Sequence, residues 1–364
     1  MLGCSLSEPP VRGFSPKPRG FSDSHGSRKA IPTLLDPRSP RHLARGAVWI
    51  LFLQADGTVK GHQKISATEG QFGGILEDSD AFGRAIASLG DVDGDGVTDL
   101  AVGTYGDDDG GQDAGAVWIL FLTAEGKVKH EQKISDVSPG LGGDLDKQDL
   151  FGTSLAALGD IDSDGVPDLA IGSPLDDEGG FDRGAVWIVT LQSTGEIKKA
   201  QKIASGVGGL ADSLDDGDYF GDAIARVGDL DADGVQDLVV GASGTDDNGA
   251  DQGALWVLFM GQDHQVTQQV KIGVIAGGLA ADLDDYDFFG SALSPLGATD
   301  GTAEPRLLVG AWGDDDGGAD KGAAYVLTLD SYCSVCGNGK KEPWEVCDDG
   351  NLTDGDGCSS SCGL

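Results

Sequence analysis

Short apolar runs separated by Gly and Asp recur along most of the chain. One set reads FGRAIASLG, DLAVGTYG, GAVWILFL and KVKHEQKIS, at 82–90, 99–106, 115–122 and 127–135. The third run is apolar at successive positions, which predicts a strand buried on both faces, and the fourth alternates polar and apolar, which predicts an outer strand. No run has helical periodicity or the length of a membrane span. The pattern therefore predicts an all-β fold.

The set of four runs repeats every 69 residues. Phe-Gly pairs begin at Phe82, Phe151, Phe220 and Phe289, and GAVWI-like runs begin at Gly46, Gly115, Gly184, Gly253 and Gly322. Four short strands per unit, graded from buried to exposed, are typical of one β-propeller blade. The chain is predicted to contribute two strands of a first unit, three full units and three strands of a last one. We thus expect a β-propeller of four to five blades, not all of them complete.

Each full unit carries the pattern DxDxDGxxD between its first and second runs, at 91–99, 160–168 and 229–237. Four carboxylates within nine positions repel one another unless they are solvated or hold a cation. Oxygen ligands at positions 1, 3, 5 and 9, a backbone carbonyl at 7 and a turn-forming Gly at 6 suit Ca²⁺. The candidate ligands are Asp91, Asp93, Asp95, Val97 and Asp99, then Asp160, Asp162, Asp164, Val166 and Asp168, and then Asp229, Asp231, Asp233, Val235 and Asp237.

These loops do not have the pattern of an EF-hand. An EF-hand needs a bidentate Glu at position 12, where Val102, Ile171 and Val240 stand here. The alternative is a solvated acidic turn without an ion. The fourth copy, 298–306, reads ATDGTAEPR and keeps only two acids, so we expect no calcium there.

Other residues recur at fixed positions of the unit. A second set of aspartates is expected to form Asx turns, with a second cation site as the alternative: Asp80, Asp149, Asp218 and Asp287, and Asp113, Asp182, Asp251 and Asp320. The aromatics of the third run are expected in the core: Trp49, Trp118, Trp187, Trp256 and Tyr325. The lysines of the fourth run are expected to face solvent: Lys64, Lys133, Lys202 and Lys271.

The Phe-Gly pairs, the segments AVGTYG, AIGSP, VVGAS and LVGAW, and the DxDxDGxxD loops together resemble the FG-GAP repeats of integrin α-subunit β-propellers and their bacterial relatives. The resemblance covers 46–330. It implies calcium loops inside β-hairpins on one face of a seven-bladed disc, and this chain supplies fewer blades. Either the strand near 59–66 completes the last blade and closes a small ring, or the sheets form an open arc.

The two ends lack the repeat. Residues 1–45 are basic and Pro-rich, with no hydrophobic signal region, and are expected to be a disordered extension or a mistaken translation start. Residues 331–364 hold five cysteines with almost no aliphatic core, so disulfides are expected to stabilise them. This tail resembles Myxococcus-type cysteine-rich repeats. Its odd cysteine count suggests truncation, and a zinc ribbon is the alternative, although a second CxxC is missing.

Composition narrows the function. The 364 residues carry a formal charge of −36, which makes nucleic acid or an anionic membrane an improbable partner. The five histidines share no repeat position and form no HExxH pattern, so no enzymatic activity is expected. We predict a secreted or surface-exposed, calcium-binding propeller for cell adhesion or protein recognition, with a protein or glycan ligand at the cell surface or matrix. The alternatives are a lectin-like propeller and an accessory domain of an extracellular hydrolase.

Overall fold

The computed structural model describes residues 44–141, 145–211, 213–231, 233–275, 279, 283–296, 305–316 and 321–329. These residues form seventeen β-strands, β1 to β17, and no helix. Accordingly, the described part of the chain has no helix that is long and apolar enough to cross a membrane. The extension at 1–43, most of the fourth acidic loop and the cysteine-rich tail lie outside the described residues, so the predictions made for them stay predictions.

The strands form five antiparallel sheets, each with its strands in chain order. The first sheet has two strands, β1 (Val48–Leu53) and β2 (Val59–Ile65). Three four-stranded sheets follow: β3 (Ile86–Gly90), β4 (Asp99–Thr104), β5 (Ala116–Leu122) and β6 (Val128–Ser135); β7 (Ser154–Gly159), β8 (Asp168–Ser173), β9 (Ala185–Leu191) and β10 (Ile197–Ile203); β11 (Phe220–Gly228), β12 (Asp237–Ala242), β13 (Ala254–Met260) and β14 (Val266–Ile272). The last sheet has three strands, β15 (Phe289–Pro295), β16 (Arg306–Ala311) and β17 (Ala323–Thr328).

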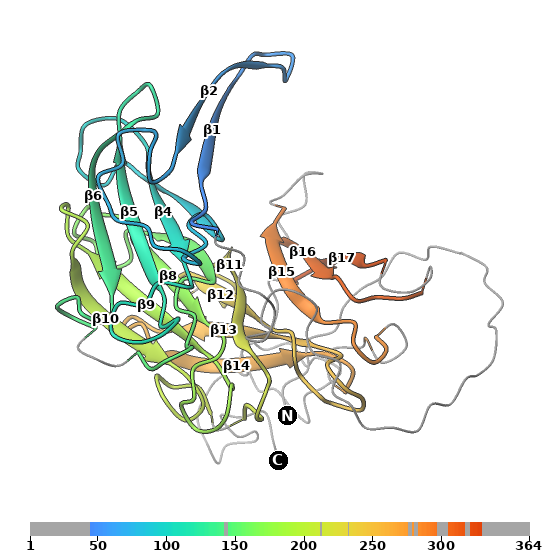
Figure 1. Ribbon diagram of the computed structural model, residues 1–364. Helices are drawn as coiled ribbons and strands as arrows, with labels where there is room; N and C mark the ends of the chain where they lie inside the picture. The colour runs from blue at the N-terminus through green and yellow to red at the C-terminus, as the bar shows by residue number, and fades with distance from the viewer. Residues whose placement is uncertain are drawn as a thin grey trace.

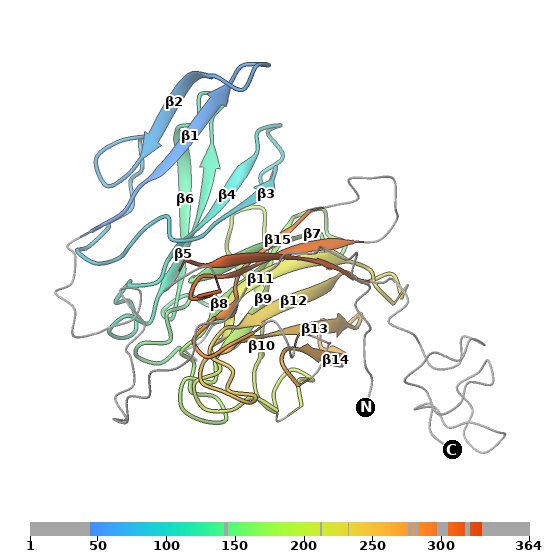
Figure 2. The ribbon, with the colours of Figure 1, turned by 90° about the vertical axis from the view of Figure 1, so that its right-hand side faces the viewer.

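The sheets follow one another as propeller blades (Figures 1 and 2). The first strand of each blade contacts the first strand of the next, from β3 to β7, β11 and β15. Four apolar clusters fill the four seams between neighbouring sheets. The third strands β5, β9 and β13 are buried at every residue, as predicted, because each is packed on both faces. The predicted all-β propeller architecture is confirmed.

The Phe-Gly pairs join neighbouring blades. Each buried Phe forms a parallel β-bridge with the Gly that precedes the third strand of the preceding blade, as in the pairs Gly115–Phe151 and Gly184–Phe220. The amide of Phe151 donates to the carbonyl of Ala114 over 2.9 Å. A Cβ on Gly115 would lie only 2.2 Å from the carbonyl oxygen of Phe151. The two glycine-containing motifs are therefore halves of one interblade joint.

The described blades form an open arc. Strand β2 pairs with β1 and not with β17, so residues 59–65 do not complete the last blade. Figure 1 shows β1–β2 at one end of the arc and β15–β17 at the other. Because no described sheet precedes β1, Trp49 is 54% exposed, whereas Trp118, Trp187 and Trp256 lie in seams and are at most 6% exposed. The expectation of a core position is thus wrong for Trp49 and confirmed for the other three tryptophans.

Candidate metal sites in the blade hairpins

Three acidic hairpin loops connect the first two strands of the complete blades. We call Asp91–Asp99 the first loop, Asp160–Asp168 the second and Asp229–Asp237 the third; they join β3 to β4, β7 to β8 and β11 to β12. In each loop the carboxylates at positions 1, 3 and 9 offer oxygen atoms that all lie within 4.8 Å of one another. The three groups are Asp91, Asp93 and Asp99; Asp160, Asp162 and Asp168; and Asp229, Asp231 and Asp237.

The aspartate at position 1 shapes the turn. In the first loop, Asp91 accepts hydrogen bonds from the amides of Asp95 over 2.9 Å and of Gly96 over 2.8 Å. In the second and third loops, Asp160 and Asp229 accept the same two hydrogen bonds from the amides at positions 5 and 6. Gly96 has a φ of +87°, a left-handed conformation that an L-residue adopts only at a cost. The Gly at position 6 thus permits the sharp turn, as predicted.

The aspartate at position 9 ties the loop to the third strand of its own blade. Asp168 is fully buried and accepts from the amides of Ile161 and Leu191, each over 2.9 Å. Asp99 and Asp237 make the corresponding pairs of bonds. Burial raises the pKa of Asp168 and of Asp237 to about 6. A nearby cation would favour the charged form of these carboxylates.

The remaining predicted ligands lie beside the three-carboxylate group. Asp95 Oδ1 accepts from the amide of Val97 over 2.8 Å, and Asp164 and Asp233 make the same bond to Val166 and Val235. The structure therefore gathers three of the four predicted carboxylates of each loop around one point. Coordination by the position-5 carboxylates and by the valine carbonyls stays a prediction.

Two lysines reach the first two loops from the fourth strand of the same blade. Lys129 Nζ lies 2.8 Å from Asp93 Oδ2 and also contacts Asp95 Oδ2. Lys198 Nζ lies 2.7 Å from Asp162 Oδ2 and 2.6 Å from Asp164 Oδ2. The sequence analysis missed both residues, although they stand 69 positions apart. The next copy has Thr267 at this position, so the third loop has no such lysine.

The electrostatic state of the loops differs accordingly. Hydrogen bonds from Lys129 and Lys198 lower the pKa of Asp95 and Asp164. In the third loop, burial and then the charges of its neighbours Asp233 and Asp229 raise the pKa of Asp231. Clustered carboxylate oxygens fit a hard divalent cation such as Ca²⁺, which takes six to eight oxygen ligands. The residues of all three loops fit this ion by their chemistry.

Of the second set of aspartates, one group caps nearby backbone amides with its side chains, as predicted: Asp80, Asp149, Asp218 and Asp287. Asp113, Asp182 and Asp251 adopt φ values of +50° to +53°, and their amides donate to the carboxylates of Asp108, Asp177 and Asp246, respectively. Asp80, Asp149, Asp218 and Asp287 each accept from the amide three residues before them. Asp320 lies outside the described residues. Local capping of a backbone amide is a role that Asp has in tight turns. For the carboxylates of Asp113, Asp182 and Asp251 that role stays a prediction.

The predicted solvent-facing role of the fourth-strand lysines is wrong for three of them. Lys133 Nζ lies 2.6 Å from Asp107 Oδ2 and 5.5 Å from the ring centroid of Trp118, and its side chain is 22% exposed. Lys202 makes the corresponding contacts with Asp176 and Trp187. Lys271 lies over Trp256 and contacts Asp247, which has the repeat position of Asp109, because Thr245 stands at the position of Asp107. Cross-strand pairing places each Lys opposite its Trp, and the ammonium groups of Lys133 and Lys202 compensate the buried carboxylates of Asp107 and Asp176.

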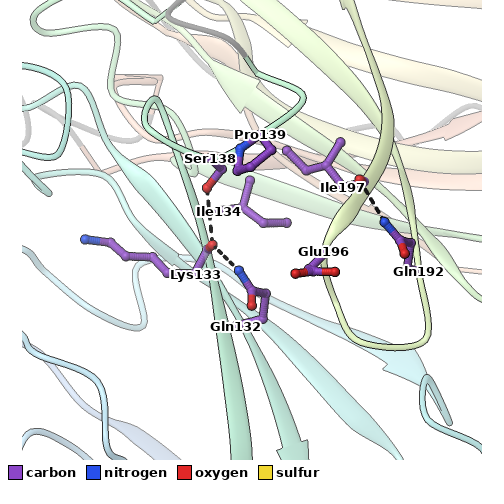
Figure 3. Close-up of a pocket in the computed structure, with 8 residues that line it drawn as sticks. All are labelled: Gln132, Lys133, Ile134, Ser138, Pro139, Gln192, Glu196 and Ile197. Carbon is purple, nitrogen blue, oxygen red and sulfur yellow. Dashed lines mark hydrogen bonds between the residues drawn. The ribbon is translucent and has the colours of Figure 1, made fainter.

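One seam opens into a cavity of about 160 Å³ between β6 and the β9–β10 hairpin (Figure 3). At two equivalent seams in the described part of the chain, a left-handed glycine carbonyl accepts from the next blade: Val128 N to Gly70 O and Val266 N to Gly208 O, both 2.9 Å. Pro139 stands at this position here and cannot adopt a positive φ. Two glutamines, Glu196 and apolar side chains line the cavity, but no aromatic ring does. Lys133 points away from the cavity in Figure 3.

Comparisons with known proteins agree with the repeat. The FG-GAP repeat model matches residues 82–120, 151–189 and 220–258, and a domain of unknown function, DUF4215, matches 321–363. Integrin alpha-3 of Cricetulus griseus is 31% identical over 229 residues, 61% of this chain and 19% of that protein. Integrin alpha-5 of Xenopus laevis is 32% identical over 177 residues, which are 45% of this chain and 15% of that protein. Integrin alpha pat-2 of Caenorhabditis elegans is 28% identical over 285 residues, which are 75% of this chain and 20% of that protein.

Each matched segment runs from the Phe-Gly pair through the acidic loop to the third strand of one complete blade. One segment of each complete blade therefore matches the FG-GAP repeat, and part of the chain is similar to integrin alpha chains. The alignments cover at most about a fifth of the length of these relatives.

Proposed function

We propose that this chain is a calcium-binding extracellular β-propeller that serves cell adhesion or protein recognition and has no catalytic role. The observation that carries the proposal is that the same cluster of three carboxylates recurs in the same hairpin of all three complete blades. A chance acidic turn would not be expected to repeat its backbone hydrogen bonds in three copies. The similarity to integrin alpha-3 and alpha-5 supports the same assignment.

The proposed ligands in each loop are the carboxylates at positions 1, 3, 5 and 9 and the carbonyl at position 7. When bound, Ca²⁺ would supply a compact positive charge that offsets the mutual repulsion of these carboxylates. The chain's own groups do the positioning: the position-1 aspartate closes the turn, and the position-9 aspartate fixes it to the third strand. Calcium would therefore rigidify the hairpin between the first two strands of a blade.

The proposed partner is a protein or glycan ligand at the cell surface or matrix. The formal charge of −36 favours a partner with basic surfaces and opposes nucleic acid or an anionic membrane as a ligand. We propose an export route as well, because the cysteine-rich segment 331–364, proposed to be a disulfide-stabilised module of the Myxococcus type, suits an oxidising compartment. The match of DUF4215 to 321–363 coincides with this segment.

The lectin-like alternative needs aromatic rings in pockets between blades. The seam cavity beside Pro139 offers glutamine and glutamate side chains but no ring on which a sugar could stack. We therefore favour recognition of a protein over recognition of a glycan.

A cell-attachment assay tests the proposed role. Animal cells would be applied to surfaces coated with the full chain in millimolar calcium, in a chelator, and with a variant carrying Asp93→Asn, Asp162→Asn and Asp231→Asn. We expect attachment in calcium, and its loss in the chelator and in the variant. No attachment in calcium would contradict an adhesive role, and a glycan array that responds to the protein would support the lectin alternative.

A further inference from the structure

We propose that Lys129 and Lys198 act as built-in cations of the first and second loops, so that the third loop is the tightest calcium site of the chain. The inference rests on the proposed function, since it assumes that the loops bind calcium. It goes further by ranking three loops whose acidic patterns are identical. The ranking depends on a residue outside the loops, on the fourth strand of each blade.

The geometry of the two lysines is the same in both blades. Lys129 on β6 and Lys198 on β10 each contact the carboxylates at positions 3 and 5 of the loop in their own blade. Position 3 belongs to the three-carboxylate group of each loop. The ammonium therefore lies against a carboxylate that a calcium ion would need as a ligand.

The third loop lacks this cation. Thr267, on β14, occupies the corresponding position, and its hydroxyl donates to the carbonyl of Phe259 over 3.1 Å. Within the described ranges, no lysine or arginine forms an ion pair with Asp229, Asp231 or Asp233. The carboxylates of this loop thus keep their mutual repulsion, which a bound cation relieves.

The consequence for calcium follows from Coulomb's law. A divalent ion and an ammonium group a few ångströms apart repel each other enough to weaken binding by on the order of tenfold, even at the dielectric constant of water. Calcium must therefore displace or tolerate a lysine in the first two loops, but not in the third. At low calcium, the lysines offset part of the negative charge of the first two hairpins, and the third hairpin depends on the ion.

The test is a calcium titration of the full chain by isothermal calorimetry. Threonine replaces the lysines beside the first two loops, and lysine replaces the threonine beside the third. The variants are Lys129→Thr with Lys198→Thr, and Thr267→Lys. Lys60→Thr is the matched control, because Lys60 has the same repeat position on β2, is exposed, and has no described acidic loop beside it. Melting temperatures in a chelator would verify that each variant folds.

We expect one tight and two weaker calcium sites in the wild-type chain, separated by about tenfold or more. The double lysine variant should tighten the two weak sites, Thr267→Lys should weaken the tight site, and Lys60→Thr should change neither. Three sites of equal affinity, unaffected by the lysine exchanges, would overturn the inference and leave the calcium proposal intact. No calcium binding by any variant would overturn the calcium proposal itself, and the inference with it.

Discussion

Aspartates that look alike in the sequence have different roles at the scale of single residues. Within the first loop, Asp91 closes the turn, Asp95 caps the amide of Val97, and Asp99 is buried against the third strand. Asp149 belongs to another class, since it closes a turn ahead of the Phe-Gly pair and lies buried near Asp176. Burial and partners, rather than residue type, set the charge state of each carboxyl group.

Asp149 should make the free energy of unfolding depend on pH. Burial, with the charge of Asp176 adding to it, raises the pKa of Asp149 from 3.8 to about 7. Between about pH 4 and about pH 7, the folded state therefore keeps a proton that the unfolded state has released. The contribution of Asp149 to the free energy of unfolding is fully present below that window and is lost as pH rises through it.

Urea unfolding in a chelator should show this loss in the wild-type chain relative to Asp149→Asn, whose side chain does not titrate. The difference in free energy of unfolding between the two proteins should fall as pH rises through the window. Glu125→Gln, at an exposed site, should give no such trend. A difference that stays constant with pH would show that Asp149 titrates normally in the folded state.

Interblade joints decide stability at the scale of elements. Gly115 and Gly217 both have positive φ values, +93° and +87°, so alanine strains the backbone at either site. A Cβ at Gly115 would also overlap the carbonyl of Phe151, whereas no atom lies within 4 Å of one at Gly217. Alanine at Gly217 therefore introduces backbone strain alone, whereas alanine at Gly115 introduces the same strain and a clash with the next blade.

We predict that Gly115→Ala lowers the free energy of unfolding by about 3 kcal/mol or more, and Gly217→Ala by roughly 1–2 kcal/mol. Equilibrium urea denaturation measures both values. Equal losses would mean that the bridge between Gly115 and Phe151 does not hold neighbouring blades together.

Much of the element-level structure was predictable from the repeat. Strand number, the double burial of the third strand and the sharp turn at Gly96 all follow from local pattern and copy-to-copy comparison. The comparison failed where a neighbour is missing, since Trp49 and Trp118 share a repeat position but not a seam. It also failed for Lys133, because alternation along a strand does not show that the buried Asp107 contacts the ammonium group from a loop. The contact of Lys129 with the first loop could have been predicted only from the repeat position that it shares with Lys198 and that Thr267 occupies in the next copy.

At the scale of the whole molecule, each complete blade combines interblade seams with an acidic hairpin. Phe-Gly pairs and third strands build the seams, and the acidic hairpins close the first two strands of each complete blade. Calcium at those hairpins would stabilise a scaffold whose described sheets form an open arc. A ligand-dependent scaffold should gain stability from the ion by mass action.

The most direct measurement of this claim is the melting temperature of the full chain against free Ca²⁺, with Mg²⁺ in parallel. The control protein carries Asp93→Asn, Asp162→Asn and Asp231→Asn. We predict a melting temperature that rises with the logarithm of Ca²⁺ in roughly the 0.1–1 mM range typical of extracellular modules, responds weakly to Mg²⁺, and loses its response in the control protein. A well-folded wild-type chain whose melting temperature does not change with calcium would contradict calcium binding by the hairpins, because they would then be acidic turns without an ion.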